Sequence, residues 1–215
     1  MSMNNKDFTN TNFFDIPSCF EELFSYPTPW ESVSQIIPFI QKMFANKTFT
    51  ANYKGRLDVF IGEGTKIHPM ADIAGPAIIG KNCVINHAAF LREGCIIGDN
   101  AHIGHAVEVK HSIILDNTML AHLNYIGDSI IGNNVNISGG AILANLRLDK
   151  KNISIKTQDS REIDTGLQKF GAVVGDNTII GVNSVINPGT LLGKNTVVFP
   201  LKSVSGIHEN NAVIK

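Results

Sequence analysis

The sequence is poor in several kinds of residue whose abundance would point to particular protein classes. Only 7% of its 215 residues are aromatic and 17% are charged, and the formal net charge is −1. With no excess of one charge, nothing favours a nucleic-acid or membrane surface. No uncharged apolar run approaches the roughly 18 residues of a membrane-spanning helix. Because 43% of the residues are apolar, we expect a globular protein that binds neither nucleic acid nor membrane.

Cysteine is also scarce, and no leader is visible. The three cysteines, Cys19, Cys83 and Cys95, are odd in number and lack metal-ligand spacing, which fits a reducing compartment. The opening stretch MSMNNKDFTNTNFF has no apolar region of the kind that marks a secretory signal. Together these features predict a cytoplasmic protein.

Glycine, by contrast, is abundant at 19 residues, and aliphatic residues recur every six positions. The recurrence slips by one residue twice and stops between residues 143 and 174. A small residue often stands four positions after the aliphatic one, and glycine often follows it directly. The repeating aliphatic positions are Ile61, Ile67, Ile73, Ile79, Ile85, Leu91, Ile97, Ile103, Val109, Ile114, Leu120, Ile126, Ile131, Ile137, Leu143, Val174, Ile180, Ile186, Leu192, Val198 and Val204.

A period of six excludes the ordinary secondary structures as its cause. An amphipathic helix needs apolar spacings of three and four, and a half-buried strand needs two. Short strands joined by tight corners, three to a triangular coil, do explain the period. Stacked coils would bury the aliphatic residues in one column, so we predict a mainly β protein, a parallel β-helix. Cys83 and Cys95 occupy small-residue positions and are expected to be inward packing groups.

Two segments depart from the repeat. Residues 1–53 are predicted to form an N-terminal helical appendage, and residues 54–215 the β-helix, with an insertion loop at 145–171. Thr28, Pro29 and Glu31 form a helix start with a capping box. The helix that follows should be kinked or divided by Pro38. We expect these helices to cover the open end of the coil stack.

The repeat register places polar residues in columns. His87, His105 and His122 each lie two residues after a repeating aliphatic, so they should stack at about the strand spacing of 4.8 Å. Arg92 and Lys110 directly follow such a residue and should form a second, cationic column. From the residues alone the histidines could be a metal site, solvent-exposed side chains or the source of a catalytic base.

From Arg92 to Lys151 the sequence resembles a specific family of hexapeptide-repeat enzymes. The motif H-L-x-Y-[IL]-G-D occurs at His122–Asp128, with V-E-x-K before it and N-V-N-I after it. It is similar to the acetyltransferase half of the bifunctional glucosamine-1-phosphate acetyltransferase/N-acetylglucosamine-1-phosphate uridyltransferases. The stretches NLRLDKK, KFGAVVGD and NPG look more like the archaeal-type sugar-1-phosphate nucleotidylyltransferases that carry an acetyltransferase domain. The resemblance spans residues 28–205 and implies a left-handed coil and a homotrimer.

The resemblance also implies roles for individual residues. His122 matches the general base, and the Gly139 N–H matches the donor to the tetrahedral oxyanion. Six residues match substrate-binding positions. Arg92, Lys110 and Tyr125 would hold the sugar phosphate, and Asn136 would lie near the substrate amine. Asn145 and Lys151 match residues of the acetyltransferase site in the archaeal-type enzymes. Acetyl-CoA, as co-substrate, would lie against Gly139, Val182 and Pro200. No metal is expected.

The sequence departs from the family in three places. No nucleotidyltransferase domain precedes the helical segment, so we expect a stand-alone acetyltransferase and no uridyl transfer. Ser138-Gly139-Gly140 stands where the family has G-A-G. Val182 replaces a serine of the bacterial enzymes, and their basic C-terminal contact has no clear equivalent here.

The resulting hypothesis is an acetyl-CoA-dependent N-acetyltransferase of glucosamine-1-phosphate or a related hexosamine-1-phosphate. It would act in UDP-N-acetylglucosamine biosynthesis. One alternative is a catalytically inactive subunit that binds sugar phosphate or partners a nucleotidyltransferase. Another is a metal-dependent hydratase that uses the histidine column.

Overall fold

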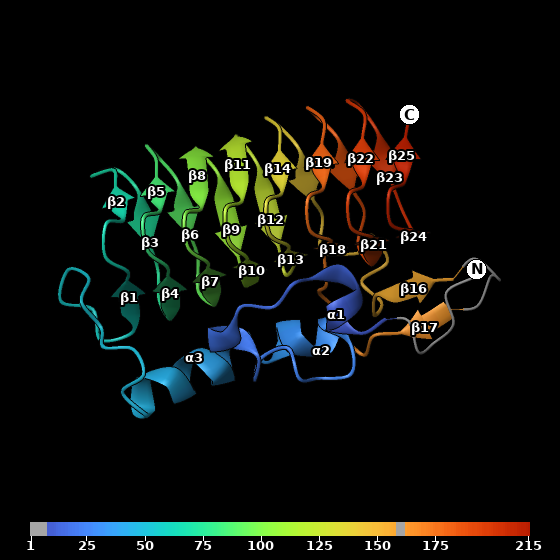
Figure 1. Ribbon diagram of the computed structural model, residues 1–215. Helices are drawn as coiled ribbons and strands as arrows, with labels where there is room; N and C mark the ends of the chain where they lie inside the picture. Colours follow the sequence, from blue (N-terminus) through green and yellow to red (C-terminus); the bar gives the residue numbers. More distant parts are fainter. Residues whose placement is uncertain (1–7, 158–161) are drawn as a thin grey trace.

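Three parallel sheets wind along the chain in the computed structural model, which describes residues 8–157 and 162–215 (Figure 1). Sheet A contains β1 (Val59–Ile61), β4 (Ala77–Ile79), β7 (Cys95–Ile97), β10 (Ser112–Ile114), β13 (Ile130–Ile131), β18 (Ala172–Val174), β21 (Thr190–Leu192) and β24 (Ile207–His208). Sheet B contains β2 (Lys66–Ile67), β5 (Val84–Ile85), β8 (His102–His105), β11 (Met119–His122), β14 (Asn136–Ile137), β19 (Ile179–Ile180), β22 (Val197–Val198) and β25 (Val213–Ile214). Sheet C contains β3 (Asp72–Ile73), β6 (Phe90–Leu91), β9 (Glu108–Lys110), β12 (Tyr125–Gly127), β15 (Ile142–Leu143), β20 (Val185–Ile186) and β23 (Ser203–Val204).

The strand register follows the six-residue repeat. In sheet A, Ile79 pairs with Ile97, 18 positions later, and Ile97 with Ile114, 17 positions later, where the repeat slips. These aliphatic side chains point inward and are fully buried. The predicted parallel β-helix of hexapeptide coils is confirmed. Cys83 and Cys95 are also fully buried as expected, and burial raises the pKa of the Cys95 thiol to about 12.

The N-terminal segment lies along the outer face of sheet A (Figure 1). It contains α1 (Asn10–Phe13), a 3-10 turn η1 (Ser18–Phe20), α2 (Pro29–Ser34) and α3 (Ile36–Ala45). Its Phe and Ile side chains pack in one cluster with the outward residues of sheet A, which are Ile78, Ile96, Ile113, Ile130, Val173 and Leu191. The expectation that these helices cover the open end of the stack is wrong. Sheet A carries aliphatic residues on both faces, so it needs a covering layer along its whole length.

The start of α2 is as predicted, and the break between the helices is not. Thr28 and Glu31 form the capping box, with the Thr28 N–H donating to Glu31 Oε2 at 2.9 Å. The helix divides at Gln35, which has φ −98° and ψ 3°, and not at Pro38. Pro38 instead lies in the first turn of α3, where a missing N–H costs no helical hydrogen bond.

The insertion leaves the coil at Asn145 and returns at Phe170, whose N–H donates to the Asn145 carbonyl. Between them β16 (Ser154–Lys156) pairs antiparallel with β17 (Glu162–Asp164). The Phe170 ring is buried and meets Trp30 edge-on at 6.3 Å between centroids. The base of the insertion therefore packs against the N-terminal helices. None of the described helices is both long and apolar enough to cross a membrane.

Candidate active site

The corner that follows each strand of sheet B, here called corner BC, brings together the predicted base and the predicted coenzyme contacts. One backbone ladder runs along it: Leu123 N–H donates to His105 O, Gly140 to His122 O, Asn183 to Gly139 O and Leu201 to Val182 O, at 2.9–3.0 Å. Successive coils therefore place in one column His87, His105, His122, Gly139, Val182 and Pro200. The residues after Leu143 join this column only because the insertion loops out and the coil resumes in register.

His122 and Gly139 are neighbours in this column. The His122 side chain is exposed at the end of β11. A Cβ added to Gly139 would lie 3.9 Å from His122 Cδ2 and no closer than 3.6 Å to any other atom. Within the described residues the Gly139 N–H donates no hydrogen bond. An unpaired N–H donor and an accessible imidazole thus lie one coil apart, about 4.8 Å along the stack.

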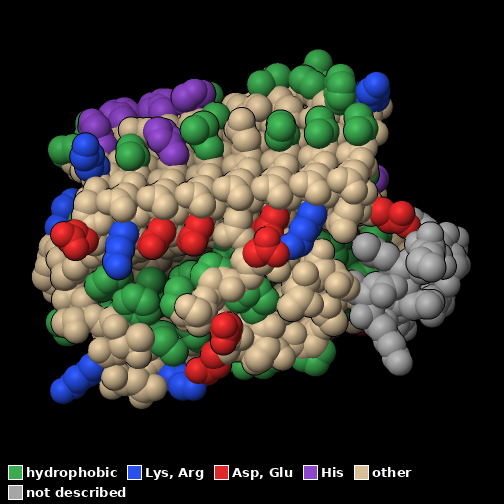
Figure 2. All heavy atoms as spheres, viewed as in Figure 1, with side chains coloured by type: hydrophobic (Ala, Val, Ile, Leu, Met, Phe, Trp, Pro, Cys, Tyr) green, Lys and Arg blue, Asp and Glu red, His purple; other side chains and the backbone are tan. Residues whose placement is uncertain are grey.

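The histidine column extends away from Gly139. His87 and His105 stack with ring centroids 5.1 Å apart, and their Nδ1 atoms are separated by 3.1 Å. The histidines form a row along the upper edge of the molecule, over the strands of sheet B (Figure 2). The register of His105 with His122 agrees with the predicted column. His68, whose ring meets His87 at 5.1 Å, was missed because it lies one residue, not two, after its aliphatic.

No metal centre is formed by this row as it stands. Among the residues that the structure describes, no group of three or more His, Cys, Asp or Glu side chains is arranged to hold a metal ion. The two facing Nδ1 atoms of His87 and His105 are instead at hydrogen-bond distance.

A second polar cluster surrounds Asp128 at the far end of the strands of sheet C. Asp128 is 4% exposed. Its carboxylate accepts hydrogen bonds from Lys110 Nζ at 3.0 and 3.1 Å, from His111 Nδ1 at 3.2 Å, and from the Asn145 amide. Burial alone would raise the pKa of Asp128, but the hydrogen bonds from His111, Asn145 and Lys110 outweigh it and hold the pKa below its usual value. The carboxylate therefore stays ionised and fixes Lys110 and Asn145.

Tyr125 lies beside this cluster on the outer side of sheet C. A Cβ added to Gly127 would come within 2.7 Å of the Tyr125 hydroxyl and 2.8 Å of Asn145 Nδ2, so the glycine leaves room for both side chains. Burial, followed by the charges of Asp128 and Glu108, raises the pKa of the Tyr125 phenol. The hydroxyl thus keeps its proton and can donate a hydrogen bond to a ligand.

Arg92 is one coil away from Lys110, as the register predicts. Its Nη1 donates to Glu108 Oε1 at 3.0 Å, and both side chains are about one-third exposed. Glu108, His111 and Asp128 were not among the predicted site residues. Glu108 lies in the V-E-x-K motif and Asp128 ends the H-L-x-Y-[IL]-G-D motif. Their places in these motifs could have identified both as site residues.

Two predicted substrate residues lie apart from these groups. Asn136 is on the outer face of sheet B, paired in register with Met119 and Ile179. Lys151 is exposed on the insertion, where its N–H donates to the Asp149 carboxylate at 3.2 Å. One chain therefore collects Arg92, Lys110, Tyr125 and Asn145 on the side of sheet C, and leaves Asn136 and Lys151 elsewhere.

Known proteins match most of the coil. A bifunctional sugar-1-phosphate nucleotidylyltransferase/acetyltransferase from Sulfurisphaera tokodaii is 37% identical over 94 residues, which are 44% of this chain and 23% of the relative. A bifunctional protein GlmU from Methanococcus vannielii is 33% identical over 178 residues, covering 79% of this chain and 41% of the relative. The chain thus spans less than half the length of these relatives.

Among solved structures, a mutant of AntD, an N-acyltransferase from Bacillus cereus in complex with dTDP and coenzyme A, aligns with a TM-score of 0.45 and 19% identity. That alignment covers 77% of this chain and 84% of AntD. The family described as the GMPPB C-terminal domain matches residues 75–214, which include both polar clusters. The chain therefore belongs to the family of the GMPPB C-terminal domain.

Proposed function

We propose that this chain catalyses transfer of an acetyl group from acetyl-CoA to the amine of a hexosamine-1-phosphate, with glucosamine-1-phosphate as the first candidate. The observation that carries the proposal is corner BC, where the exposed imidazole of His122 lies beside the free N–H of Gly139. The proposal is further supported by relatives whose names include sugar-1-phosphate acetyltransferases. Neither a covalent intermediate nor a metal is part of it.

The chemistry follows from these two groups. The amine nitrogen attacks the thioester carbonyl carbon while His122 takes the N–H proton, which makes the nitrogen a competent nucleophile. The carbonyl oxygen gains negative charge and accepts a hydrogen bond from the Gly139 N–H. When the tetrahedral species collapses, the C–S bond breaks and the proton held by His122 passes to the departing thiolate. Imidazole suits both transfers because it titrates near neutral pH.

Corner BC also offers a track for the coenzyme. Val182 and Pro200 continue the column beyond Gly139. Val182 is 46% exposed, and Phe199 and Leu201 beside Pro200 are 42% and 74% exposed. The apolar ridge of Val182, Phe199 and Leu201 would pack against the pantetheine arm of the coenzyme. This packing would replace the hydrogen bond that a serine at position 182 would make.

The cations on the side of sheet C would bind the phosphate and so orient the amine. Both cations already have carboxylate partners, which leaves only part of their donor capacity for substrate. Lys110 directs hydrogen bonds to both Asp128 oxygens, so one of its three donors is free. Arg92 uses Nη1 for Glu108, and its other N–H groups can meet a phosphate in a forked arrangement. Tyr125 and Asn145 would complete this side of the site.

A homotrimer is part of the proposal because one chain does not join all the substrate residues. The N-terminal segment covers sheet A, so the exposed faces are those of sheets B and C. Asn136 lies on sheet B and Arg92 follows a strand of sheet C. These faces diverge at corner BC, so one sugar contacts both residues only if a second copy supplies one of them. Lys151, on the insertion, would reach the substrate in the same way.

Subunit mixing tests the site and its assembly together. Purified protein is assayed for loss of the acetyl-CoA thioester with glucosamine-1-phosphate and its galacto isomer. The variants Asn136→Ala and Arg92→Ala should each lose activity, and chains unfolded together and refolded as mixtures should regain part of it. If mixtures stay inactive while wild-type protein is active, the shared site is wrong. If wild-type protein consumes no thioester with either sugar, the chain does not have the proposed activity.

A further inference from the structure

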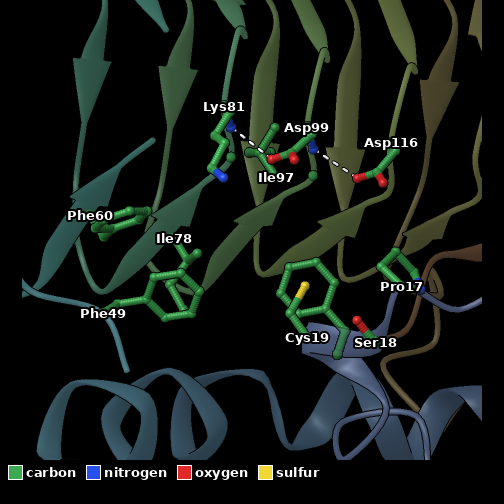
Figure 3. A pocket seen from close by; sticks show the side chains of 13 residues that line it. Pro17, Ser18, Cys19, Phe49, Phe60, Ile78, Lys81, Ile97, Asp99 and Asp116 are labelled. Atoms are coloured by element: carbon green, nitrogen blue, oxygen red, sulfur yellow. Dashed lines mark hydrogen bonds between the residues drawn. The ribbon is translucent and has the colours of Figure 1, made fainter. Parts of the chain in front are cut away.

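A cavity remains between the N-terminal segment and the first coils of sheet A, and no residue of the catalytic column lines it. Its volume is about 370 Å³, within the range of about 300–1,000 Å³ that small-molecule sites occupy. Figure 3 shows it bounded below by η1 and Phe49, and above by residues of three successive coils. The cavity is not formed by residues of the proposed acetyl-transfer site.

The floor of this cavity is apolar and largely aromatic. Phe49 and Phe60 lie with ring centroids 4.7 Å apart. The apolar lining also includes Pro17, Phe20, Ile78 and Ile97. The last three are almost fully buried in the protein, so their positions are fixed by packing. Such a floor suits the ring or branched alkyl body of a ligand.

The upper wall carries two carboxylates on one edge of the coil. Asp99 Oδ1 accepts the Lys81 N–H and Asp116 Oδ1 accepts the Asp99 N–H, both at 2.7 Å. Within the described residues, the second oxygen of each carboxylate accepts no hydrogen bond. Lys81 also lines the cavity, but its ammonium is in no ion pair with either carboxylate.

Asp176 occupies the equivalent position further along the stack, and both of its carboxylate oxygens have partners. Asp176 accepts the Asn133 N–H at 2.7 Å through Oδ1, just as Asp99 and Asp116 accept theirs. Its Oδ2 accepts the Asp15 N–H at 2.7 Å and lies 3.3 Å from Lys194 Nζ. There the N-terminal segment and a lysine supply a donor and a positive charge. At Asp99 and Asp116 none of the described residues donates a hydrogen bond to the second carboxylate oxygen or forms an ion pair with it, although Lys81 lines the same cavity.

The geometry points to a binding site for a protonated organic amine, with its apolar body on the Phe20–Phe49–Phe60 floor and its ammonium against Asp99 and Asp116. Two neighbouring groups respond to the negative field expected there. Burial and the charge of Asp99 raise the pKa of Asp116. Partial burial and the charge of Asp116 raise the pKa of the Cys19 thiol, which lines the same cavity. An ammonium would relieve both, whereas a carboxylate ligand would add to the repulsion.

Cys19 provides a reporter of occupancy. It is the exposed member of the chain's three cysteines, and Cys83 and Cys95 are buried. Its alkylation by iodoacetamide, followed by intact-mass spectrometry, should therefore report on the cavity alone. The probes are tryptamine and indole-3-propionate, which share the indole ring and carry opposite charges. Free cysteine treated in parallel corrects for direct effects of the probes on the reagent.

Saturating tryptamine should slow Cys19 alkylation about tenfold, because the bound indole covers the thiol and this shielding outweighs the gain in thiolate that the ammonium causes. Indole-3-propionate should leave the rate unchanged. The variant Asp116→Asn keeps an oxygen for the Asp99 N–H and loses the charge, so tryptamine should bind about tenfold more weakly. Asp72→Asn, the same change on the exposed part of sheet C, should have no effect. Titration calorimetry on Cys19→Ser protein should give the same order of affinities.

Three results would overturn the assignment: equal protection by the two indoles, unchanged tryptamine affinity in Asp116→Asn, or no protection and no binding heat with either probe. The Ser18→Phe variant adds a check that needs no charge change. Ser18 is an exposed residue at the cavity wall, so a phenyl ring there can fill the space from outside. It should abolish tryptamine binding, and retained binding would place the ligand elsewhere.

Discussion

Replacing Asp128 by asparagine should strongly destabilise the protein, because it breaks a buried ion pair. The side chains of Lys110 and Asp128 are 13% and 6% exposed, and three side chains donate to the carboxylate. Asp128→Asn leaves the Lys110 ammonium without its counter-charge. Breaking one partner of such a buried pair costs about 3–5 kcal/mol. The amide oxygen still accepts one bond, so we expect a loss of about 3 kcal/mol in the free energy of unfolding.

The stability difference between wild type and Asp128→Asn should depend on pH, and the pKa of Asp128 sets the direction of that dependence. The pKa of Asp128 is lower in the folded protein than its usual value, so the carboxylate stabilises the fold above about pH 4. That contribution fades as the pH falls toward the depressed pKa. The difference between wild type and Asp128→Asn should therefore be largest near neutral pH and shrink below about pH 4. Urea unfolding followed by circular dichroism measures it.

Two further variants separate the ion pair from other effects. Lys110→Met added to Asp128→Asn removes the orphaned charge and should recover most of the lost stability. Glu108→Gln breaks the Arg92–Glu108 pair, whose side chains are 35% and 36% exposed, and should cost no more than about 1 kcal/mol. A loss for Asp128→Asn as small as that for Glu108→Gln, or one independent of pH, would refute the reasoning.

The remaining predictions concern the reaction and the coil. His122→Ala should lower kcat about 10²- to 10⁴-fold and leave the urea midpoint unchanged, because the exposed imidazole contributes only proton transfer. Stopped-flow kinetics measures kcat, and an unaltered kcat would remove His122 from the mechanism. Gly139→Ala should leave stability unchanged, since its Cβ meets nothing within 3.6 Å. Gly140→Ala should cost about 1 kcal/mol or more, because φ is +72° and the Cβ would collide with Asn183 Oδ1; equal melting temperatures would contradict the assigned backbone. Native protein at pH 8 should take up one alkyl group, at Cys19, because the Cys95 thiol is buried with a pKa of about 12; a second rapid adduct would contradict that burial.

The coil could be predicted because single aliphatic residues repeat at a fixed period along the sequence. One aliphatic every six positions fixes strand, corner and stacking, and even the 17-residue coils follow from the slips. The place of the N-terminal helices had a signal that was overlooked. Aliphatic doublets such as Ile78-Ile79 and Ile96-Ile97 occur on six consecutive strands of sheet A, from β4 to β21, and on fewer strands of sheets B and C. Their unbroken run makes sheet A apolar on both faces along most of its length, and helices cover such a sheet.

The site divides in the same way. The column of His87, His105 and His122 follows from register, which depends on the repeat. The contacts around Asp128 do not, because they depend on how Lys110 and Asn145 turn at a corner where an insertion begins. Spacing along the chain says nothing about those side-chain directions. The cavity above Phe20 and Phe49 depends on how residues 17–20 and Phe49 pack against the coil, and no periodicity places those two segments.

The most direct test of the acetyltransferase proposal is identification of the product. The protein is incubated with acetyl-CoA labelled with ¹³C at the carbonyl and with glucosamine-1-phosphate, and the mixture is analysed by mass spectrometry and NMR. The proposal predicts a ¹³C-acetamide on the sugar nitrogen, free CoA in equal amount, and neither product with His122→Ala. Folded wild-type protein that leaves glucosamine-1-phosphate and its isomers unmodified would contradict it.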